Sequence, residues 1–299
     1  MQYSRKFFSL MFAGMLAMAS ASCSAETDAP AASPVDSKLT EKNINDALKK
    51  AYDKYKGLKE GANADYIPAL AKVDSNIFGI VLVTVDGKVY TVGDIESEVS
   101  IQSISKVFTM AKVTEEKGID ALPKNVGVDA TGQVFNSIYA IEQHQGHEMN
   151  PLVNAGAITT TSMVSGKSYN EIWNKILGYY SDFAGRELTV LEDIYKSEAD
   201  TNQRNQAIAH LMYAYGHIEG DPLQATDIYT RQCSVGVNAK DLGTMAATLA
   251  NAGTNPVTGK QLVKPEDMPE ILAGMATAGR GFPWQVRYCG HFSAAGCCR

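Results

Sequence analysis

At 299 residues, 45% of them hydrophobic, the chain is long enough to build one large domain or two modest ones around a sizeable core. Its formal net charge is −6, and it has no block of consecutive basic residues. Both features argue against binding to the phosphate backbone of a nucleic acid. The expected partner is therefore a small molecule.

The first 25 residues have the layout of a secretory signal peptide. Arg5 and Lys6 precede an apolar run over residues 7–19, and small residues follow that run. The run is too short to span a bilayer. We therefore expect residues 1–25 to direct a periplasmic or secreted protein, with no stable membrane span.

Two cleavage positions fit this signal, after Ala21 or after Ala25. Cys23 is the weaker alternative, a lipid attachment site, because the leucine expected before such a cysteine is lacking. The polar and proline-bearing residues 26–38 are typical of a linker.

The mature region begins with a predicted helix over residues 40–56, whose apolar residues recur at helical spacing behind Thr40 as a cap. Two strands are predicted next, over residues 77–85 and 88–92. Asp86-Gly87 between them favours a two-residue type I′ turn, which requires positive φ angles. An antiparallel hairpin therefore precedes Ser103.

A helix is predicted from Ser103 to Glu116, ended by Gly118. The spacing of apolar residues and the capping residues predict further helices over residues 169–177, 205–215, 222–229 and 239–250. Strands cluster at one end and helices follow, which indicates an α+β architecture: an antiparallel sheet flanked by helices, with a helical subdomain.

Ser103 and Lys106 stand three residues apart in "IQSISKVF", so on a helix they share one face. A serine hydroxyl becomes a nucleophile when a base takes its proton, and a lysine can be that base if burial lowers its pKa. Phe108 or the hairpin would provide such burial. The pattern Ser-x-x-Lys also arises by chance roughly once in a chain of this length, so these residues alone do not settle their role.

Other catalytic arrangements have less support. The histidines lie outside recognisable catalytic motifs, and no G-x-S-x-G motif occurs. The cysteine-rich end does not have the paired C-x-x-C spacing of structural zinc sites; its candidate ligands are Cys289, His291, Cys297 and Cys298. We therefore expect no metal site.

Several stretches around Ser103 occur in a familiar order: "ADYIPAL", "IQSISKVFTMA", "VFNSIYAIE", "NPLVNAGAITTTS", "SEADTNQRNQAIAHLM" and "DIYTRQCS". Together they resemble the serine-dependent glutaminase family over about Leu39 to Ala278. The resemblance implies a β-lactamase-like fold, related to that of penicillin-binding proteins. It also implies hydrolysis of L-glutamine to L-glutamate and ammonia through a γ-glutamyl ester, without a metal or organic cofactor, by a homo-oligomer that is a tetramer or a dimer.

The resemblance also assigns roles to residues. Ser103 falls on the nucleophile of the family and Lys106 on its general base. The other matched positions contact glutamine together with Ser103; they are Tyr66, Asn154, Glu198, Asn205 and Tyr229. These residue types suit a substrate whose ammonium and carboxylate must both be paired when they leave water.

The family pattern stops after "ILAGMATAG", and no Lys-Ser-Gly strand follows. We therefore expect an incomplete glutaminase domain over residues 39–279, an aberrant tail over residues 280–299 with C-terminal strands missing, and an unpaired edge on the hairpin. This expectation predicts little or no activity for the chain. Two alternatives stay open: a β-lactamase-like or penicillin-binding serine hydrolase, and a non-catalytic remnant that binds an amino acid.

Overall fold

The computed structural model describes residues 40–147 and 149–278, and the backbone of residues 295–298. The chain divides into two compact units, Met1–Leu39 and Thr40–Arg299. The expected signal peptide (1–25) and linker (26–38) lie outside the described residues, as does most of the expected tail (280–299).

The predicted hairpin is present, but its turn differs from the prediction. Strand β1 (Gly79–Val83) pairs antiparallel with β2 (Val89–Gly93), and Val83 lies opposite Val89. The Thr84 N–H donates to the Lys88 carbonyl at 3.0 Å, which encloses a three-residue loop. Within that loop only Gly87 has a positive φ, of 80°. The loop is therefore longer than a two-residue type I′ turn, because Asp86 keeps an ordinary conformation and Gly87 alone supplies the left-handed residue.

The other edge of β1 is paired as well. Strand β5 (Ala295–Cys298) runs antiparallel to β1, with Ile80 opposite Cys297, and the strand order is β2-β1-β5. The expectation that the hairpin has an unpaired edge is therefore wrong for β1. A strand from the cysteine-rich tail occupies that edge and provides its backbone partners.

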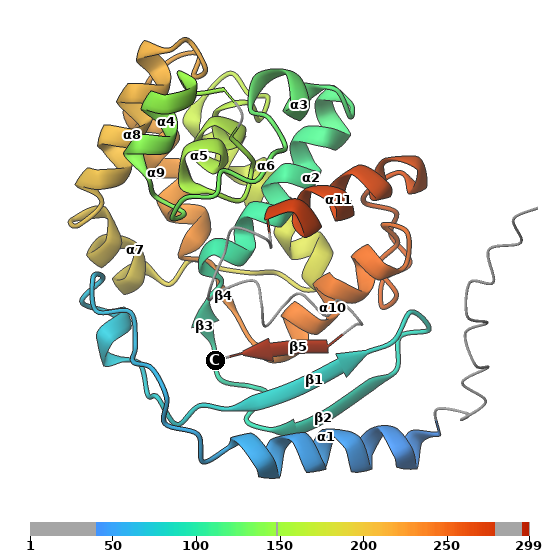
Figure 1. Cartoon of the computed structure of the whole chain (residues 1–299). Helices are drawn as coiled ribbons and strands as arrows, with labels where there is room; N and C mark the ends of the chain where they lie inside the picture. Colours follow the sequence, from blue (N-terminus) through green and yellow to red (C-terminus); the bar gives the residue numbers. More distant parts are fainter. Residues whose placement is uncertain (1–39, 148, 279–294, 299) are drawn as a thin grey trace, which may run out of the picture. The chain divides into compact units, whose positions relative to one another are not determined.

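The two faces of the sheet are covered by different helices (Figure 1). Helix α1 (Glu41–Tyr55), capped by the Thr40 side chain as predicted, packs on one face. Its Leu48 forms a buried cluster with Phe78, Ile80 and Tyr90. Helix α10 (Ala239–Ala250) packs on the other face, where the buried residues are Val81, Val83, Ala239 and Ala247. Alternate residues of β1 thus face opposite layers, as a strand between two helices requires.

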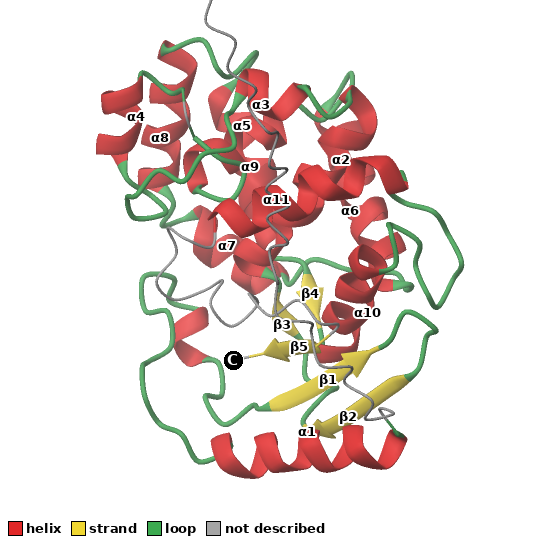
Figure 2. Cartoon of the chain, turned by 45° about the vertical axis from the view of Figure 1, so that its right-hand side comes forward, coloured by secondary structure: helices red, strands yellow, loops and turns green. Residues whose placement is uncertain are grey.

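The remaining helices gather beyond α10, on one side of the strands (Figure 2). They are α2 (Ser105–Lys117), α3 (Ala121–Asn125), α4 (Ile138–His144), α5 (Asn154–Ser162), α6 (Tyr169–Ala184), α7 (Glu192–Ala199), α8 (Gln203–Ala214), α9 (Pro222–Cys233) and α11 (Met268–Ala278). Short 3₁₀ turns occur at η1 (Leu70–Lys72), η2 (Gln102–Ile104) and η3 (Pro265–Asp267). A second small sheet pairs β3 (Val99–Ser100) with β4 (Gly236–Val237). This arrangement confirms the predicted α+β class.

The predicted helices are confirmed with corrected ends. The helix over residues 239–250 has the predicted bounds, whereas α6 and α9 continue past their predicted ends to Ala184 and Cys233. The most buried helix, α5, was not predicted. The Thr160 and Thr161 hydroxyls donate to the carbonyls of Gly156 and Ala157, one turn earlier, at 2.7 and 2.9 Å. Such a helix has no polar face to reveal it by periodicity.

Candidate active site

Ser103 lies where the small sheet passes into the helical subdomain. The Ile101 N–H donates to the Val235 carbonyl at 2.8 Å, just after β3 ends. Gln102 then takes a positive φ of 49°, an unfavourable conformation for a residue with a side chain. Ser103 therefore lies in the turn η2, immediately before α2, rather than inside that helix as the sequence predicted. The strained residue turns the chain sharply at the serine.

Lys106 is 1% exposed, on the first turn of α2. Its Nζ donates to the Asn154 Oδ1 at 2.8 Å and to the Leu152 carbonyl at 3.2 Å. Burial lowers the pKa of this amine to about 8, although Cys233 and Glu198 act in the opposite direction. The two acceptors can take both hydrogens of a neutral amine, which leaves its lone pair available to accept a proton.

Aromatic rings contribute to the burial of Lys106. The Nζ lies 6.0 Å from the ring centroid of Phe135 and 5.9 Å from that of Tyr229. Phe108, which the sequence suggested for this purpose, packs instead against Phe183 in the core, with ring centroids 4.9 Å apart. The predicted burial is thus confirmed, but other residues provide it.

Asn154 joins three helices at the lysine. It is the first residue of α5 and is buried. Its Nδ2 donates to the Asn205 Oδ1 on α8 at 2.9 Å, and the Tyr229 hydroxyl on α9 donates to its Oδ1 at 3.3 Å. Three of the residues that the resemblance assigned to glutamine contact therefore bond to one another beside Lys106.

Glu198 is 7% exposed although it carries a carboxyl group. Burial raises the pKa of this carboxyl to about 7, against the opposing effects of the Gln102 amide and of Lys106. The Gln102 Nε2 lies 3.5 Å from its Oε2. The residue after Gln102 is Ser103, so Glu198 lies at the serine turn. A buried carboxylate of this kind is suited to a cationic group brought by a ligand.

Tyr66 reaches the same place from a surface segment and is 59% exposed. Burial of its hydroxyl and the nearby Glu198 carboxyl raise the pKa of its phenol. The Ala69 N–H donates to the Ser197 hydroxyl at 3.1 Å, which ties this segment to α7. The structure therefore brings all the sequence-predicted site residues together at one junction.

Three contributors were missed by sequence reasoning. Gln102 contacts Glu198, and Leu152 contributes only its backbone carbonyl, which leaves no signal in a sequence. The Cys233 thiol lies 3.7 Å from the Ser105 hydroxyl, and burial raises its pKa to about 12. That thiol stays protonated at neutral pH and is a poor nucleophile. Gln102 and Cys233 lie inside motifs already singled out, so their proximity to the site had a sequence signal.

Over residues 40–147 and 149–278 no cluster of His, Cys, Asp or Glu side chains has a geometry that could hold a metal ion. Within the same residues, no helix combines the length and the apolar content that a membrane span requires. The candidate zinc ligands that the sequence suggested all lie in the tail, outside the described side chains.

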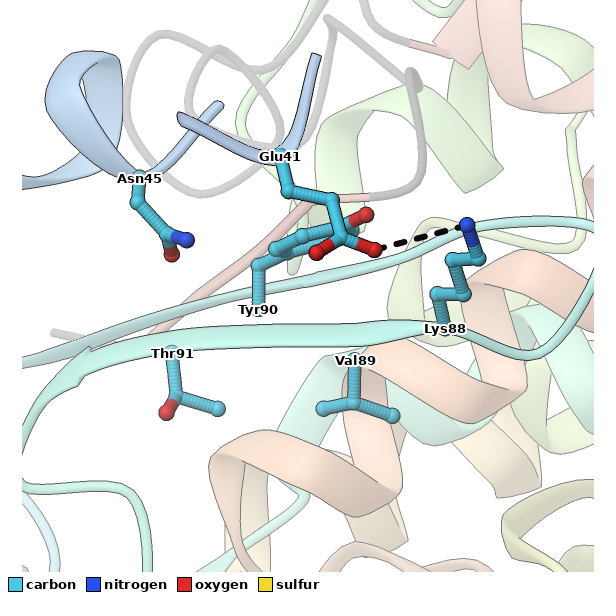
Figure 3. A pocket seen from close by; sticks show the side chains of 6 residues that line it. All are labelled: Glu41, Asn45, Lys88, Val89, Tyr90 and Thr91. Carbon is cyan, nitrogen blue, oxygen red and sulfur yellow. Dashed lines mark hydrogen bonds and ion pairs between the residues drawn. The ribbon is translucent and has the colours of Figure 1, made fainter. Parts of the chain in front are cut away.

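A surface hollow of about 440 Å³ lies away from these residues, between α1 and β2 (Figure 3). It is lined by Glu41, Asn45, Lys88, Val89, Tyr90 and Thr91. Its one ion pair joins the Lys88 Nζ to the Glu41 Oε1 at 3.5 Å, between two exposed side chains. Exposed pairs of this kind contribute little to stability, and the hollow shares no residue with the serine turn.

An antiparallel sheet beside a helical subdomain, with a serine turn and a buried lysine at their junction, defines a β-lactamase-like protein. A family model described as Glutaminase matches residues 61–281. The chain belongs to the glutaminase family, whose members hydrolyse the side-chain amide of glutamine.

Relatives and solved structures agree with this assignment. A glutaminase of Colwellia psychrerythraea (strain 34H / ATCC BAA-681) is 50% identical over 236 residues, which cover 79% of this chain and 76% of the relative. The solved structure of a probable glutaminase, ybaS, matches with a TM-score of 0.78 at 40% identity, over 80% of this chain and 77% of that one. A probable glutaminase from Bacillus subtilis, complexed with 6-diazo-5-oxo-L-norleucine, matches with a TM-score of 0.69 at 25% identity, over 81% and 73%.

Proposed function

We propose that this glutaminase works through a covalent γ-glutamyl ester on Ser103, with Lys106 as the base. The observation that carries the proposal is the burial of Lys106 together with its two acceptors, Asn154 and Leu152. Burial favours the neutral amine, and the acceptors orient it. Ser103 follows a strained residue in the turn that leads directly into the helix of Lys106.

In the first half of the reaction the Ser103 oxygen bonds to the side-chain amide carbon of glutamine, and its proton passes to the Lys106 nitrogen. The carbon–nitrogen bond then breaks, and the departing nitrogen takes that proton and leaves as ammonia. In the second half, water gives one proton to Lys106 and bonds to the ester carbon. Glutamate leaves as the Ser103 oxygen regains its proton.

Substrate recognition is assigned to the polar groups around the serine. Glu198 is proposed to pair with the α-ammonium of glutamine, since a buried carboxylate gains most from a cationic partner. The amide groups of Asn154 and Asn205 are proposed to donate to its carboxylate, and the hydroxyls of Tyr66 and Tyr229 to donate to an oxygen or relay a proton. The relative that is complexed with 6-diazo-5-oxo-L-norleucine, an amino acid of similar length, supports an amino-acid site in this fold.

The test measures ammonia release from L-glutamine by residues 26–299 and by a version in which a family-type C-terminus replaces the tail, because little or no activity is expected of the first. The variants are compared in the second version. Ser103→Ala and Lys106→Ala should each lose activity by on the order of 10³-fold or more, and the double variant should be little worse than either single variant, because both residues serve one step. Glutamate binding by Ser103→Ala should stay within a few-fold of the native value. Additive losses, or retained turnover in Ser103→Ala, would exclude the shared step.

Export is proposed as well, on the strength of the charged and apolar layout of residues 1–25. Mass spectrometry of the protein made in cells should show a chain that begins after Ala21 or Ala25. A product that keeps Met1 and stays in the cytosol would refute the proposal, and a lipid-modified Cys23 would replace the soluble product with an anchored one.

A homo-oligomer, either a tetramer or a dimer, is proposed from the family resemblance alone. Light scattering coupled to size-exclusion chromatography measures the mass directly. A mass that stays at that of one chain across the concentration range, 32.2 kDa less the removed signal peptide, would reject the proposal.

A further inference from the structure

One carboxylate in the helical subdomain accepts hydrogen bonds from two tyrosines on different helices. The Tyr169 hydroxyl, at the start of α6, donates to the Asp227 Oδ2 at 2.6 Å. The Tyr195 hydroxyl, on α7, donates to the Asp227 Oδ1 at 2.7 Å. Asp227 itself lies on α9. Both bonds are short and charge-assisted, so each fixes the position of its tyrosine strongly.

Contacts fix the ring of Tyr195 in addition to its hydroxyl. The guanidinium carbon of Arg231, one turn after Asp227 on α9, lies 5.8 Å from the centroid of that ring and 4.7 Å from the ring of Trp173. Cation–π contacts of this kind favour one placement of the ring. Burial and the hydrogen bond to Asp227 both raise the pKa of the Tyr195 phenol, so it keeps the proton that it donates.

Helix α7 is also held by two other hydrogen bonds: the N–H of its N-cap residue Leu191 donates to the Ser234 carbonyl at 2.9 Å, and the Ala69 N–H donates to the Ser197 hydroxyl at 3.1 Å. The helix has only eight residues, its N-cap makes no side-chain hydrogen bond, and its one buried residue is Glu198. Tyr195 precedes Glu198 by three residues, so the two side chains leave the helix on nearly the same face. A shift of α7 along or around its axis would therefore move both side chains together.

We propose that Tyr195 is a positioning residue that, through its hydrogen bond to Asp227, holds Glu198 where the α-ammonium of the substrate binds. The inference rests on the role proposed above for Glu198. It assigns recognition of the free amino group to a unit made of α7 and α9, separate from the chemistry at Ser103. Tyr169 uses the same carboxylate but belongs to α6, so it has no share in this task.

The experiment compares Tyr195→Phe with Tyr169→Phe in the full mature chain and in the version that carries the family-type C-terminus. Each change removes one hydroxyl that donates to the same Asp227 carboxylate, so the direct loss of bonding is matched. Tyr195→Phe should raise KM for L-glutamine by about ten-fold and change kcat by less than about two-fold, because the lost interaction acts on binding of the ammonium. Tyr169→Phe should change KM by less than about two-fold.

Competitive inhibitors distinguish misplacement of Glu198 from a general loss of stability. The Ki of L-glutamate, which carries the α-ammonium, should rise in Tyr195→Phe by the same factor as KM. The Ki of glutarate, which lacks that group, should stay within about two-fold. A loss of stability that merely lowers the folded fraction would change both inhibitors alike. Asp227→Asn, which keeps the size but removes the charge, should show the same selectivity and replaces Tyr195→Phe if that variant does not fold.

The outcomes distinguish this inference from the proposed function. If Glu198→Gln leaves KM unchanged, the ammonium role of Glu198 fails and the positioning role fails with it. If Glu198→Gln raises KM but Tyr195→Phe does not, only the positioning role is overturned. Equal KM changes in the two tyrosine variants, or equal changes for glutamate and glutarate, would also overturn it.

Discussion

Glu198 and Lys106 are ionisable side chains that the fold buries, although water would stabilise the charged form of each. Burial is the largest cause of both pKa shifts, to about 7 for Glu198 and to about 8 for Lys106. Two groups that titrate close to neutral pH in one small site are typical of catalytic centres. Burial of these two groups therefore lowers the stability of the unliganded protein.

Replacement of Glu198 by glutamine should reveal that cost. Between pH 4.5, the ordinary pKa of glutamic acid, and about 7, the folded protein keeps a proton that the unfolded chain releases. The free energy of unfolding of the native protein thus falls as pH rises through this window, by about 3 kcal/mol in total. Glutamine stays neutral, so the stability advantage of Glu198→Gln should grow from near zero at about pH 4.5 to about 3 kcal/mol above pH 7.

Urea unfolding at a series of pH values measures this difference. The exposed Glu219→Gln serves as the control for loss of one surface charge and should change the free energy of unfolding by less than about 0.5 kcal/mol. A Glu198→Gln advantage that is the same at pH 5 and pH 8 would show that Glu198 holds its proton equally in the folded and unfolded chains.

For single residues, the sequence indicates which side chains form the site better than it indicates how deeply each is buried. Motif order singled out Ser103, Lys106 and the glutamine-contact positions, and the fold brings these separate motifs to one junction. The same residues gave no sign that Glu198 is buried, since a glutamate after "YKS" is usually solvated. Its burial depends on α9 and on Gln102, which are distant in the sequence.

Helix α5 is an element that hydrophobic periodicity does not predict. All of its residues except the last are buried, so it has no polar face that alternates with an apolar one. Helix α1 was found with nearly correct bounds, because it has one face on the sheet and one in water. Helix α10 was found as well, although nine of its twelve residues are buried. The hairpin strands were found but the turn was not, since Asp-Gly also suits a three-residue loop with glycine in the left-handed conformation.

Gly156 lets α5 approach the loop that carries Leu152. A Cβ at this position would lie 1.9 Å from the Asn150 carbonyl oxygen. Relief of this clash would require the backbone at Asn150 or in α5 to move. Gly156→Ala should therefore destabilise the protein by about 1–3 kcal/mol. It should also reduce ammonia release, because the Leu152 carbonyl that accepts from Lys106 would move.

Gly178 is the matched control for that substitution. It lies on the exposed side of α6, and no atom lies within 4 Å of the position its Cβ would take. Gly178→Ala should stabilise the protein by about 0.5–1 kcal/mol and leave activity unchanged, because alanine restricts the unfolded chain and favours the helix. Urea unfolding of both variants would contradict this account if the two substitutions changed stability in the same direction.

For the whole molecule, the sheet depends on a strand contributed from its far C-terminal end. Deletion of residues 295–299 should leave the backbone groups of β1 on that side without partners. An unpaired edge of this kind promotes association with other chains. We expect a lower Tm and a rise in light scattering on heating, whereas deletion of Arg299 alone should change neither. An unaltered Tm after the longer deletion would mean that the pairing contributes nothing to stability.

The pairing of β5 with β1 also sets the order in which the protein can be made. β2 leaves the ribosome directly after β1, while β5 follows β1 by more than two hundred residues. Pairing across such a separation must wait for nearly the whole chain, and contacts of this kind slow folding. During synthesis β1 therefore has one strand partner and waits for the other. In refolding followed by pulsed hydrogen exchange, the β1 amides that bond to β2 should become protected first, and those that bond to β5 should be among the last.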